Sequence, residues 1–583
     1  MKVSDFIVKY LSTKTDKVFG GQGGSIVHIA DSIDKSNKIQ FIPGQNEQAS
    51  SIAADAYHRA SGKLGVSIAT SGPGVLNLLQ GMACSYFDSI PSLYISGAPV
   101  TKQIRKNKNI RQIGFQEMEV VDLVKPLTKY AVQIKRPEDL QYELDKALEI
   151  AYSGRKGPVL LDIPDDIQRS NLDPKKLRKY KSKNKKIIRI NKSKINIIIK
   201  ELEKSERPIL IIGNGVKLSN SENLVKKIIK KNKLPYAPTW ATVDTFKHND
   251  QLNAGTFGVA ATRYGNFSIQ NADLLIFLGA RLSPQLVGSN MNIFSPKSKK
   301  IVVDVDKYEF KNHRLKKSVI KINANVYDVL KELSMKKIDL KKTNILNWIN
   351  KIKSYKKNFP VLASKKIIKK NKYLDPYHFF DSLSKVTKSN DILIPDASAN
   401  LIWFMQSYKT YSLGQKIFTA LNHSPMGYSM PATVGAFLGK PSSRVLAFIG
   451  DGSMQMNIQE LETIKHFNIN TKIFILNNKG YGLVKQTQET WLKSNYVGVD
   501  KKSGLSLPDF LEVSKAYKIK TIQIKSNKNI IQKLKNVLRI KGPVIIELII
   551  DPKARVNPKI DFGRPLHDMS PRLDKKILKS III

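Results

Sequence analysis

The sequence predicts an α/β protein built from three doubly wound parallel-sheet domains. The chain has 583 residues, a length that suits about three domains. Short, nearly unbroken apolar runs alternate with stretches of helical periodicity, which is typical of parallel strands covered on both faces. Lysine-rich stretches at residues 175–186 and 337–371 separate the units, so we interpret them as connectors, the second partly helical around residues 345–352.

The first unit is expected at residues 1–169. Apolar runs at residues 39–42 and 66–69 predict strands, and residues 75–86 predict the helix that follows the second run. Glu47 lies between the first of these strands and an alanine-rich helix, so it occupies a strand-to-helix junction.

The second unit is expected at residues 187–336. Strands are predicted at residues 208–212, 273–279 and 300–306, and the first of them leads into Gly213-Asn214-Gly215. A strand that ends in a glycine-rich turn fits a doubly wound domain of the nucleotide-binding type.

The third unit is expected at residues 373–551, and a tail follows at residues 552–583. Residues 445–449 and 472–476 are apolar runs that predict parallel strands. Apolar side chains recur at three-residue spacing across residues 458–467, which predicts a crossover helix between these two strands.

Gly450-Asp451-Gly452 follows the first of these strands, and Asn478 follows the second. The carboxyl ends of parallel strands meet at one edge of a sheet, where open α/β folds bind ligands. Mg²⁺ prefers oxygen ligands, so Asp451, Asn478 and a carbonyl near Gly480 are the candidate ligands of a magnesium diphosphate. The two glycines would let the backbone approach that diphosphate. A tight turn beside an unrelated Asn is the alternative.

Several ordered motifs extend along almost the whole chain. They are residues 41–54 with Glu47, Ala69-Thr70-Ser71-Gly72-Pro73-Gly74, Phe87-Asp88-Ser89-Ile90-Pro91, Gly114-Phe115-Gln116-Glu117, Pro425-Met426-Gly427-Tyr428 and Gly450-Asp451-Gly452-Ser453-Met454-Gln455-Met456-Asn457. Together they resemble the acetolactate synthase-like enzymes, which use thiamine diphosphate (ThDP). The resemblance implies pyrimidine-binding, central and diphosphate-binding domains. It also implies a Mg²⁺-dependent carboligase that decarboxylates a 2-oxo acid, most simply pyruvate, and transfers the acyl unit to an acceptor carbonyl.

The resemblance also implies roles for individual residues. Glu47 would activate the cofactor through its pyrimidine, although a first-turn acid favoured by the helix dipole is the alternative. Met426 would hold the cofactor bent, and an ordinary buried methionine is the alternative. Gln116 would lie near the reacting centre. The other candidate cofactor-binding residues are Thr70, Gly72, Pro73, Gly427, Gly450, Gly452, Ser453 and Gly480.

The resemblance also suggests roles for two basic residues, Arg281 and Lys129. In the family the second domain holds FAD as a structural group, and Arg281 of Gly279-Ala280-Arg281 is a candidate contact to a flavin phosphate; a domain without nucleotide is the alternative. Lys129 occupies a position associated with the substrate channel, although such a lysine is usually solvated.

Departures from the acetolactate synthase pattern concern the acceptor. Thr487 stands where the family has a tryptophan, so a larger acceptor such as a keto sugar is an open alternative. His423 stands where an apolar residue is usual; it is either a proton shuttle, a contact to a polar acceptor or an inert loop histidine. A 2-oxo-acid decarboxylase, a flavin-dependent oxidase and a basic binding protein on a retired enzyme fold are the remaining alternatives.

The family architecture implies a homodimer or homotetramer, with Glu47 of one subunit facing the diphosphate domain of another, and a small regulatory subunit as a candidate partner. The net charge is +49, from 97 Lys and Arg against 48 Asp and Glu. The basic residues are spread among Asn and Ile, so we interpret the charge as compositional bias and expect no nucleic-acid partner. With one cysteine, Cys84, and no signal peptide or membrane-length run, a cytoplasmic protein is expected.

Overall fold

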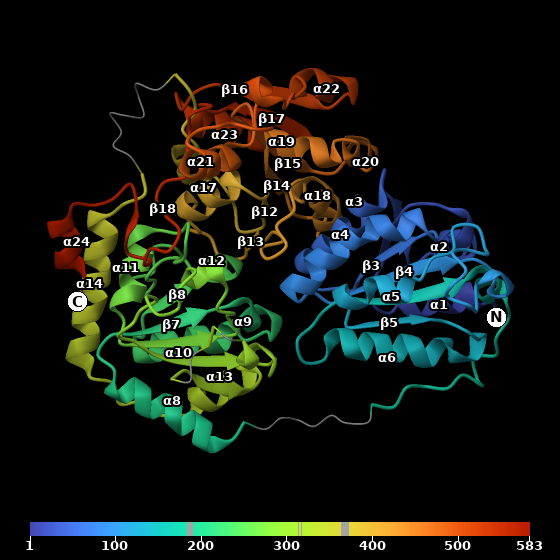
Figure 1. Cartoon of the computed structure of the whole chain (residues 1–583), viewed down its shortest axis with the longest axis horizontal. Coiled ribbons are helices and arrows are strands. Elements are labelled where there is room, and N and C mark those ends of the chain that lie inside the picture. The colour runs from blue at the N-terminus through green and yellow to red at the C-terminus, as the bar shows by residue number, and fades with distance from the viewer. Residues whose placement is uncertain (183–189, 313, 316–317, 363–371, 583) are drawn as a thin grey trace.

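The computed structural model describes residues 1–182, 190–312, 314–315, 318–362 and 372–582. Within these residues the strands form three parallel sheets and a short antiparallel pair in the tail. Figure 1 shows the three domains around a common centre, the first in blue, the second in green and the third in orange. The predicted fold class is therefore confirmed, whereas parts of both predicted connectors lie outside the described residues.

The first sheet has the strand order β2-β1-β3-β4-β6-β5. Its strands are β1 (Lys17–Gly20), β2 (Gln40–Pro43), β3 (Gly65–Ala69), β4 (Ser92–Ala98), β5 (Tyr130–Gln133) and β6 (Val159–Pro164). The helices around it are α1 (Val3–Leu11), α2 (Val27–Asp34), α3 (Glu47–Ser61), α4 (Pro73–Asp88), α5 (Val120–Val124), α6 (Leu140–Tyr152) and α7 (Asp165–Arg169). Every residue of β3 and β4 is buried, as expected of strands covered on both faces.

The second sheet has the strand order β11-β10-β9-β7-β8. Its strands are β7 (Pro208–Ile212), β8 (Tyr236–Pro238), β9 (Leu274–Leu278), β10 (Lys299–Asp304) and β11 (Ile320–Asn323). Its helices are α8 (Lys192–Lys204), α9 (Asn214–Leu218), α10 (Glu222–Asn232), α11 (Arg263–Asn271), α12 (Pro284–Val287) and α13 (Val326–Met335). The helix expected in the second connector is α14 (Lys342–Asn358), which buries Trp348 against this domain.

The third sheet, β13-β12-β14-β15-β17-β16, repeats the connectivity of the first. Its strands are β12 (Ile392–Pro395), β13 (Lys416–Ile417), β14 (Val445–Gly450), β15 (Thr471–Asn477), β16 (Lys520–Ile524) and β17 (Val544–Ile549). Its helices are α16 (Pro376–Ser384), α17 (Ala399–Ser407), α18 (Ser429–Gly439), α19 (Asp451–Met454), α20 (Glu460–His466), α21 (Gly482–Trp491), α22 (Phe510–Ala516) and α23 (Ile530–Arg539). The predicted crossover helix between β14 and β15 is α20.

Helix α3 of the first domain packs closely against α18 of the third. A Cβ atom built on Gly435 would lie 1.9 Å from the carbonyl oxygen of Ala53, so only glycine permits this approach. Beside this contact, buried Arg59 pairs with Asp55 and Asp88. The Asp88 carboxylate also accepts from the backbone N–H of Leu421 at 2.9 Å. The first domain is thereby fixed to the loop that leads to α18.

The tail returns to the second domain. It forms β18 (Lys559–Ile560), β19 (Met569–Ser570) and α24 (Lys575–Ile581), and buried Met569 and Ile581 join the core beside α11 and α14. The described residues of the tail therefore pack on the core of the second domain. None of the described helices combines the length and apolar character that a membrane crossing requires.

Candidate active site

Asp451 lies at the carboxyl end of β14, and it begins α19. Its side chain is buried, with 1% of the residue exposed. Oδ2 accepts from the backbone N–H of Gly480 at 2.9 Å, and Oδ1 accepts from the N–H of Gly452 at 2.8 Å. Burial raises the pKa of Asp451 to about 6, because the charged form loses its hydration. A buried carboxylate of this kind is suited to pairing with a cation.

Asn478 follows β15 and is also buried. Its amide nitrogen lies against Gly482, where a Cβ atom would approach it to 2.3 Å. The strand ends therefore bring Asp451, Asn478 and Gly480 together, as the sequence predicts. This set offers carboxylate, amide and carbonyl oxygens, which fit a hard cation such as Mg²⁺. Among the described residues no three His, Cys, Asp or Glu side chains cluster to hold a metal ion by themselves, so a cation here would depend on the Asn478 amide and on backbone carbonyls as well as on Asp451.

The glycines of this edge differ in what surrounds them. A Cβ atom on Gly450 would meet nothing closer than the Ser453 hydroxyl at 3.9 Å, so open space for a phosphate exists there. A Cβ atom on Gly452 would instead lie 2.0 Å from the Tyr481 ring. One on Gly427 would lie 2.6 Å from the Met456 side chain and 3.2 Å from the Ser453 carbonyl. Packing, as well as ligand approach, therefore requires glycine at 452 and 427.

The loop that carries Met426 is held by Asp396, a residue that the sequence reasoning missed. Asp396 follows β12 and accepts from the N–H of Gly427 at 3.1 Å and of Ser429 at 2.9 Å. Burial raises its pKa to about 6. Because β12 and β14 are neighbours, Asp396 and Asp451 follow adjacent strand ends, where the strand order reverses. An acid directly after an apolar run was the available signal.

Glu47 begins α3, and its side chain is half-buried. The Asn77 amide donates to Oε2 at 2.9 Å, and Oε1 lies where Gly21 has no side chain, 2.5 Å from its Cβ position. Asn77 and Gly21 were also missed. The signal for the second was the glycine-rich stretch of residues 20–24 directly after β1. In the described part of one chain, no hydrogen bond or ion pair links Glu47 to Asp451.

Thr70 and Gly72 follow β3, next to β1 in the sheet. The Thr70 hydroxyl shares a 2.9 Å hydrogen bond with the Ser25 hydroxyl. A Cβ atom on Gly72 would meet Gln116 at 2.9 Å, so Gln116 lies directly over this turn. Pro73 begins α4. The structure thus brings the predicted pyrimidine-side residues to one edge of the first sheet.

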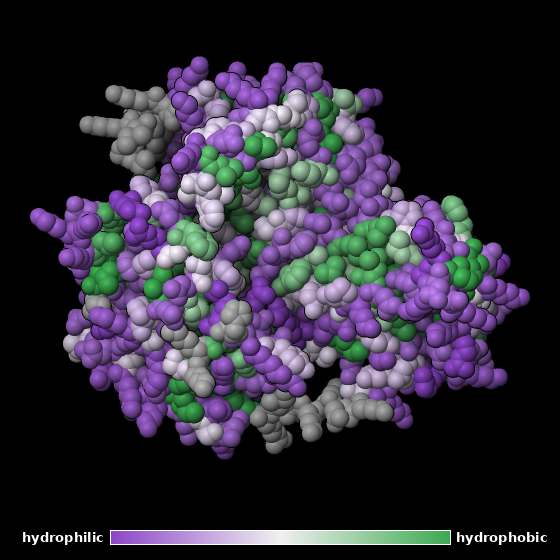
Figure 2. Space-filling view, viewed as in Figure 1, coloured by the Kyte–Doolittle hydropathy of each residue, from purple (hydrophilic) through white to green (hydrophobic). Residues whose placement is uncertain are grey.

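Apolar side chains remain exposed beside this edge. Phe115 is 83% exposed and Leu76 on α4 is 43% exposed. Figure 2 shows an apolar band on the first domain, over the region of α3 and α4, bordering the hollow between the domains. Large exposed apolar side chains next to a polar site are typical of a surface that another chain covers.

A cavity of about 810 Å³ lies between the three domains. In the second domain it begins at neighbouring strand ends, where Gly213 and Gly279 lie so close that a Cβ atom on Gly213 would meet the Gly279 carbonyl at 2.2 Å. Arg281 lines the cavity and donates to the Asn422 side chain at 2.6 Å. Thr487 of α21 lines the same cavity, so the space reaches from the second domain to the third.

Lys129 and His423, two further residues singled out in the sequence, lie outside the two sheet edges described above. The Lys129 ammonium group donates to the carbonyls of Ile150 and Ser153 at the end of α6 and does not line this cavity; its place in a substrate channel stays a prediction. His423 stacks on Phe87, with ring centroids 5.7 Å apart, and partial burial lowers its pKa. A lowered pKa keeps His423 neutral near pH 7, in a form that can accept a proton.

Three family models match the chain. They are the N-terminal TPP binding domain of thiamine pyrophosphate enzymes at residues 1–123, their central domain at residues 195–333 and their C-terminal TPP binding domain at residues 396–548. Both sheet edges described above lie within the matched ranges. The chain therefore belongs to the thiamine pyrophosphate enzyme family.

Within that family the chain is an acetolactate synthase-like enzyme. It is 30% identical over 572 residues to the acetolactate synthase large subunit of Cyanidium caldarium, covering 96% of this chain and 94% of the relative. Probable acetolactate synthase large subunits from Methanocaldococcus jannaschii and Methanococcus aeolicus are 30% and 31% identical, covering 99% and 96% of this chain and 97% and 93% of those relatives. The resemblance seen in the motifs is thereby confirmed.

Proposed function

We propose that this ThDP-dependent enzyme decarboxylates a 2-oxo acid, most simply pyruvate, and transfers the acyl unit to an acceptor carbonyl. Bound ThDP supplies the carbon nucleophile for this chemistry. The observation that carries the proposal is the pair of sites at Glu47 and Asp451 in two sheets of the same connectivity. The strand order of the first sheet reverses between β1 and β3, and the Glu47 carboxyl group lies beside Gly21, directly after β1; Asp451 follows β14, where the third sheet reverses. One edge supplies an acid for the pyrimidine, and the other supplies oxygen ligands for a diphosphate-bound Mg²⁺.

The residues act as follows. Glu47 holds a proton at its carboxyl group for the pyrimidine nitrogen, and Asn77 fixes the orientation of that carboxyl by donating to Oε2. Asp451, Asn478 and the Gly480 carbonyl bind Mg²⁺. Met426 would contact the cofactor from a loop that Asp396 holds. Gln116, which lies over Gly72, would face the reacting atoms of the bound cofactor.

The complete site requires two chains. Glu47 has no contact with Asp451 within the described part of one chain, and Phe115, next to Gln116, is 83% exposed. A second copy that covers this surface would bring its own Asp451, Asn478 and Gly480 close to Glu47 of the first copy. We therefore propose a homodimer as the smallest active unit. A homotetramer and a small regulatory subunit are compatible additions.

The cavity of about 810 Å³ supports FAD as a second cofactor. Its walls combine a close pair of glycine turns at Gly213 and Gly279 with the Arg281 guanidinium. Glycine turns that let the backbone approach a pyrophosphate, together with a cation, are the features that bind dinucleotides at strand reversals. Arg281 would contact the FAD phosphate.

A second candidate function concerns the acceptor. Thr487 lines the cavity where the acetolactate synthase pattern has an indole, and its hydroxyl donates to the Leu483 carbonyl at 3.0 Å. The smaller side chain leaves room for a larger acceptor, such as a keto sugar. The first candidate remains a small 2-oxo acid, as the name of the relatives indicates.

The test incubates the purified protein with ThDP, Mg²⁺, FAD and pyruvate, with 2-oxobutyrate and a keto sugar as competing acceptors. Mass spectrometry identifies the products, and the Glu47→Gln variant is the control for uncatalysed reaction. Acetolactate or its 2-oxobutyrate homologue supports the first candidate, and a ligated sugar supports the second. Release of only carbon dioxide and aldehyde would contradict carboligation, and no turnover with any acceptor would contradict the proposal.

A further inference from the structure

The turn that carries Asn478 and Gly480 is supported from behind by a loop at residues 492–504. The N–H of Tyr481 donates to the Val499 carbonyl at 3.0 Å. A Cβ atom on Gly480 would lie 2.1 Å from that same carbonyl oxygen. Gly480 has φ of 137°, a conformation that side-chain-bearing residues rarely adopt. The position of the loop therefore bears directly on the turn.

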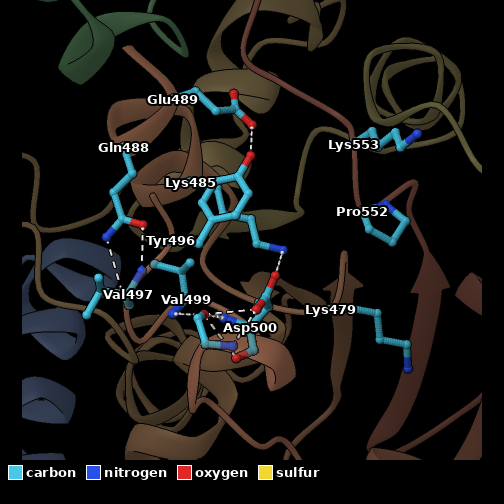
Figure 3. A network of polar contacts seen from close by, with 12 residues as sticks. Lys479, Lys485, Gln488, Glu489, Tyr496, Val497, Val499, Asp500, Pro552 and Lys553 are labelled. Carbon is cyan, nitrogen blue, oxygen red and sulfur yellow. Dashed lines mark hydrogen bonds and ion pairs between the residues drawn. The ribbon is translucent and has the colours of Figure 1, made fainter. Parts of the chain in front are cut away.

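Three side chains of α21 hold this loop, and Figure 3 shows them side by side. The Lys485 ammonium group pairs with Asp500 Oδ2 at 2.8 Å. The Gln488 amide donates to the Val497 carbonyl at 3.1 Å and accepts from the Val497 N–H at 3.2 Å. Residues 485, 488 and 489 share one helix face, because they are three and four positions apart.

The third contact of this face is Glu489, which accepts from the Tyr496 hydroxyl at 2.6 Å. Arg555, from the segment after β17, donates to the Glu489 carboxylate at 2.8 Å. The loop is thereby tied to α21 and, through Glu489, to the chain that follows the sheet.

Asp500 also organises the loop internally. Its carboxylate accepts from the Ser503 N–H at 3.0 Å, while the Ser503 hydroxyl accepts from the N–H of Val499 at 3.0 Å. The residue that pairs with Lys485 is therefore next to the carbonyl that contacts the metal turn. Loss of the Lys485 ammonium group would therefore free Asp500, and the neighbouring Val499 carbonyl would no longer be held against Gly480.

The Lys485 end of this pair is buried, and the Asp500 end is partly exposed. Lys485 is 7% exposed, and the side chain of Asp500 is 20% exposed. Removal of the Lys485 charge would leave the partly buried Asp500 carboxylate without its cation, so the loop would lose one of its attachments to α21. An exposed pair such as Lys515 and Glu512, at 60% and 67% side-chain exposure, has no such consequence.

We infer that Lys485 is a positioning residue for the metal site, acting through Asp500 and the loop at residues 492–504. The inference rests on the proposed binding of Mg²⁺ and ThDP at Asp451, Asn478 and Gly480. Groups that orient metal ligands from behind affect the affinity of the metal without touching it.

The test compares wild type with the variants Lys485→Met, Lys485→Arg and Lys515→Met. Hydrogen exchange of the dimer without cofactor reports on the amides of Gly480 and Tyr481. Exchange at these two amides is expected to accelerate in Lys485→Met, remain near wild type in Lys485→Arg and stay unchanged in Lys515→Met. Unchanged exchange in Lys485→Met would overturn the inference.

The second measurement is calorimetric titration of ThDP at fixed Mg²⁺ concentration. The Kd of Lys485→Met is expected to rise about 10-fold, as for other residues that support metal ligands, with recovery in Lys485→Arg. Equal Kd values for wild type and Lys485→Met would overturn the inference while leaving the proposed function intact. If wild type bound no ThDP, the proposed function would fail, and the exchange result would decide whether Lys485 holds the turn.

Discussion

The backbone N–H of Gly480 donates to Oδ2 of Asp451 at 2.9 Å, and this bond joins the ends of β14 and β15. It holds two proposed Mg²⁺ ligands, the carboxylate and the Gly480 carbonyl, at one point of the sheet edge. The same bond gives one oxygen of the buried Asp451 carboxylate a hydrogen-bond donor. The protein chain therefore holds these two proposed ligands together by its own hydrogen bond.

The Asp451→Asn variant is expected to lose ThDP binding and remain folded. The amide keeps the shape and an acceptor for the Gly480 N–H, but removes the charge that attracts Mg²⁺. Residues behind a metal site change affinity by about 10- to 100-fold, so a direct ligand is expected to exceed about 100-fold. Titration of ThDP and Mg²⁺ into the variant measures this loss. Binding equal to wild type would exclude Asp451 as a ligand.

The Glu47→Gln variant is expected to bind ThDP and turn over slowly. The glutamine side-chain oxygen can still accept the hydrogen bond from Asn77, but glutamine does not exchange a proton with the pyrimidine. General acid–base groups contribute about 10²- to 10⁴-fold in rate, and kcat is expected to fall within that range. Pyruvate consumption at saturating cofactor measures kcat, and Glu512→Gln, which changes an exposed carboxylate, is the control. Wild-type kcat would contradict the role of Glu47.

The Thr487→Trp variant is expected to narrow the acceptor range. An indole at this position would fill part of the cavity between Arg281 and α21, so a keto sugar would lose access before 2-oxobutyrate does. One added or missing methylene group in a pocket changes the ratio of kcat/KM for two competing substrates by about 10- to 200-fold. The ratio of 2-oxobutyrate product to sugar product is therefore expected to rise by at least about 10-fold. Product ratios with both acceptors present measure it. An unchanged ratio would place the acceptor elsewhere.

The sequence predicted that the ends of β14 and β15 bring Asp451 and Asn478 to one edge of the sheet, because every step of that inference was local. Apolar runs located the ends of β14 and β15, and the parallel arrangement then required Asp451 and Asn478 to meet. The same logic located Glu47 after β2. Periodicity and spacing are sufficient when a site is assembled from consecutive strand ends.

Side chains that depend on distant partners were not predictable in this way. Asn77 reaches Glu47 from a different helix, and Lys485 finds Asp500 beyond the end of α21. The hydrogen-bond partners of Lys129 were not predictable either, because only the folded chain shows that its ammonium group faces the end of α6. Each contact depends on how a loop or helix packs, which the spacing of apolar residues does not encode.

Glu460 is a buried acid at the contact between the first and third domains. It accepts from the N–H of Gln45 at 3.0 Å and from the Thr463 hydroxyl at 2.7 Å, and 1% of the residue is exposed. Burial raises the pKa of Glu460 from 4.5 to about 7, because the ionised form is poorly hydrated there. Unfolding at neutral pH therefore releases a proton from this site.

The sign of the pH dependence follows from the raised pKa. The contribution of Glu460 to stability is fully present below about pH 4.5 and is lost as the pH rises through about 7. The loss amounts to about 3 kcal/mol, from about 1.4 kcal/mol for each unit of pKa difference. The Glu460→Gln variant is expected to remove this slope, so that it is more stable than wild type at pH 8 and similar at pH 4.5. Denaturant unfolding at both pH values tests this, and parallel pH profiles for the two proteins would refute it.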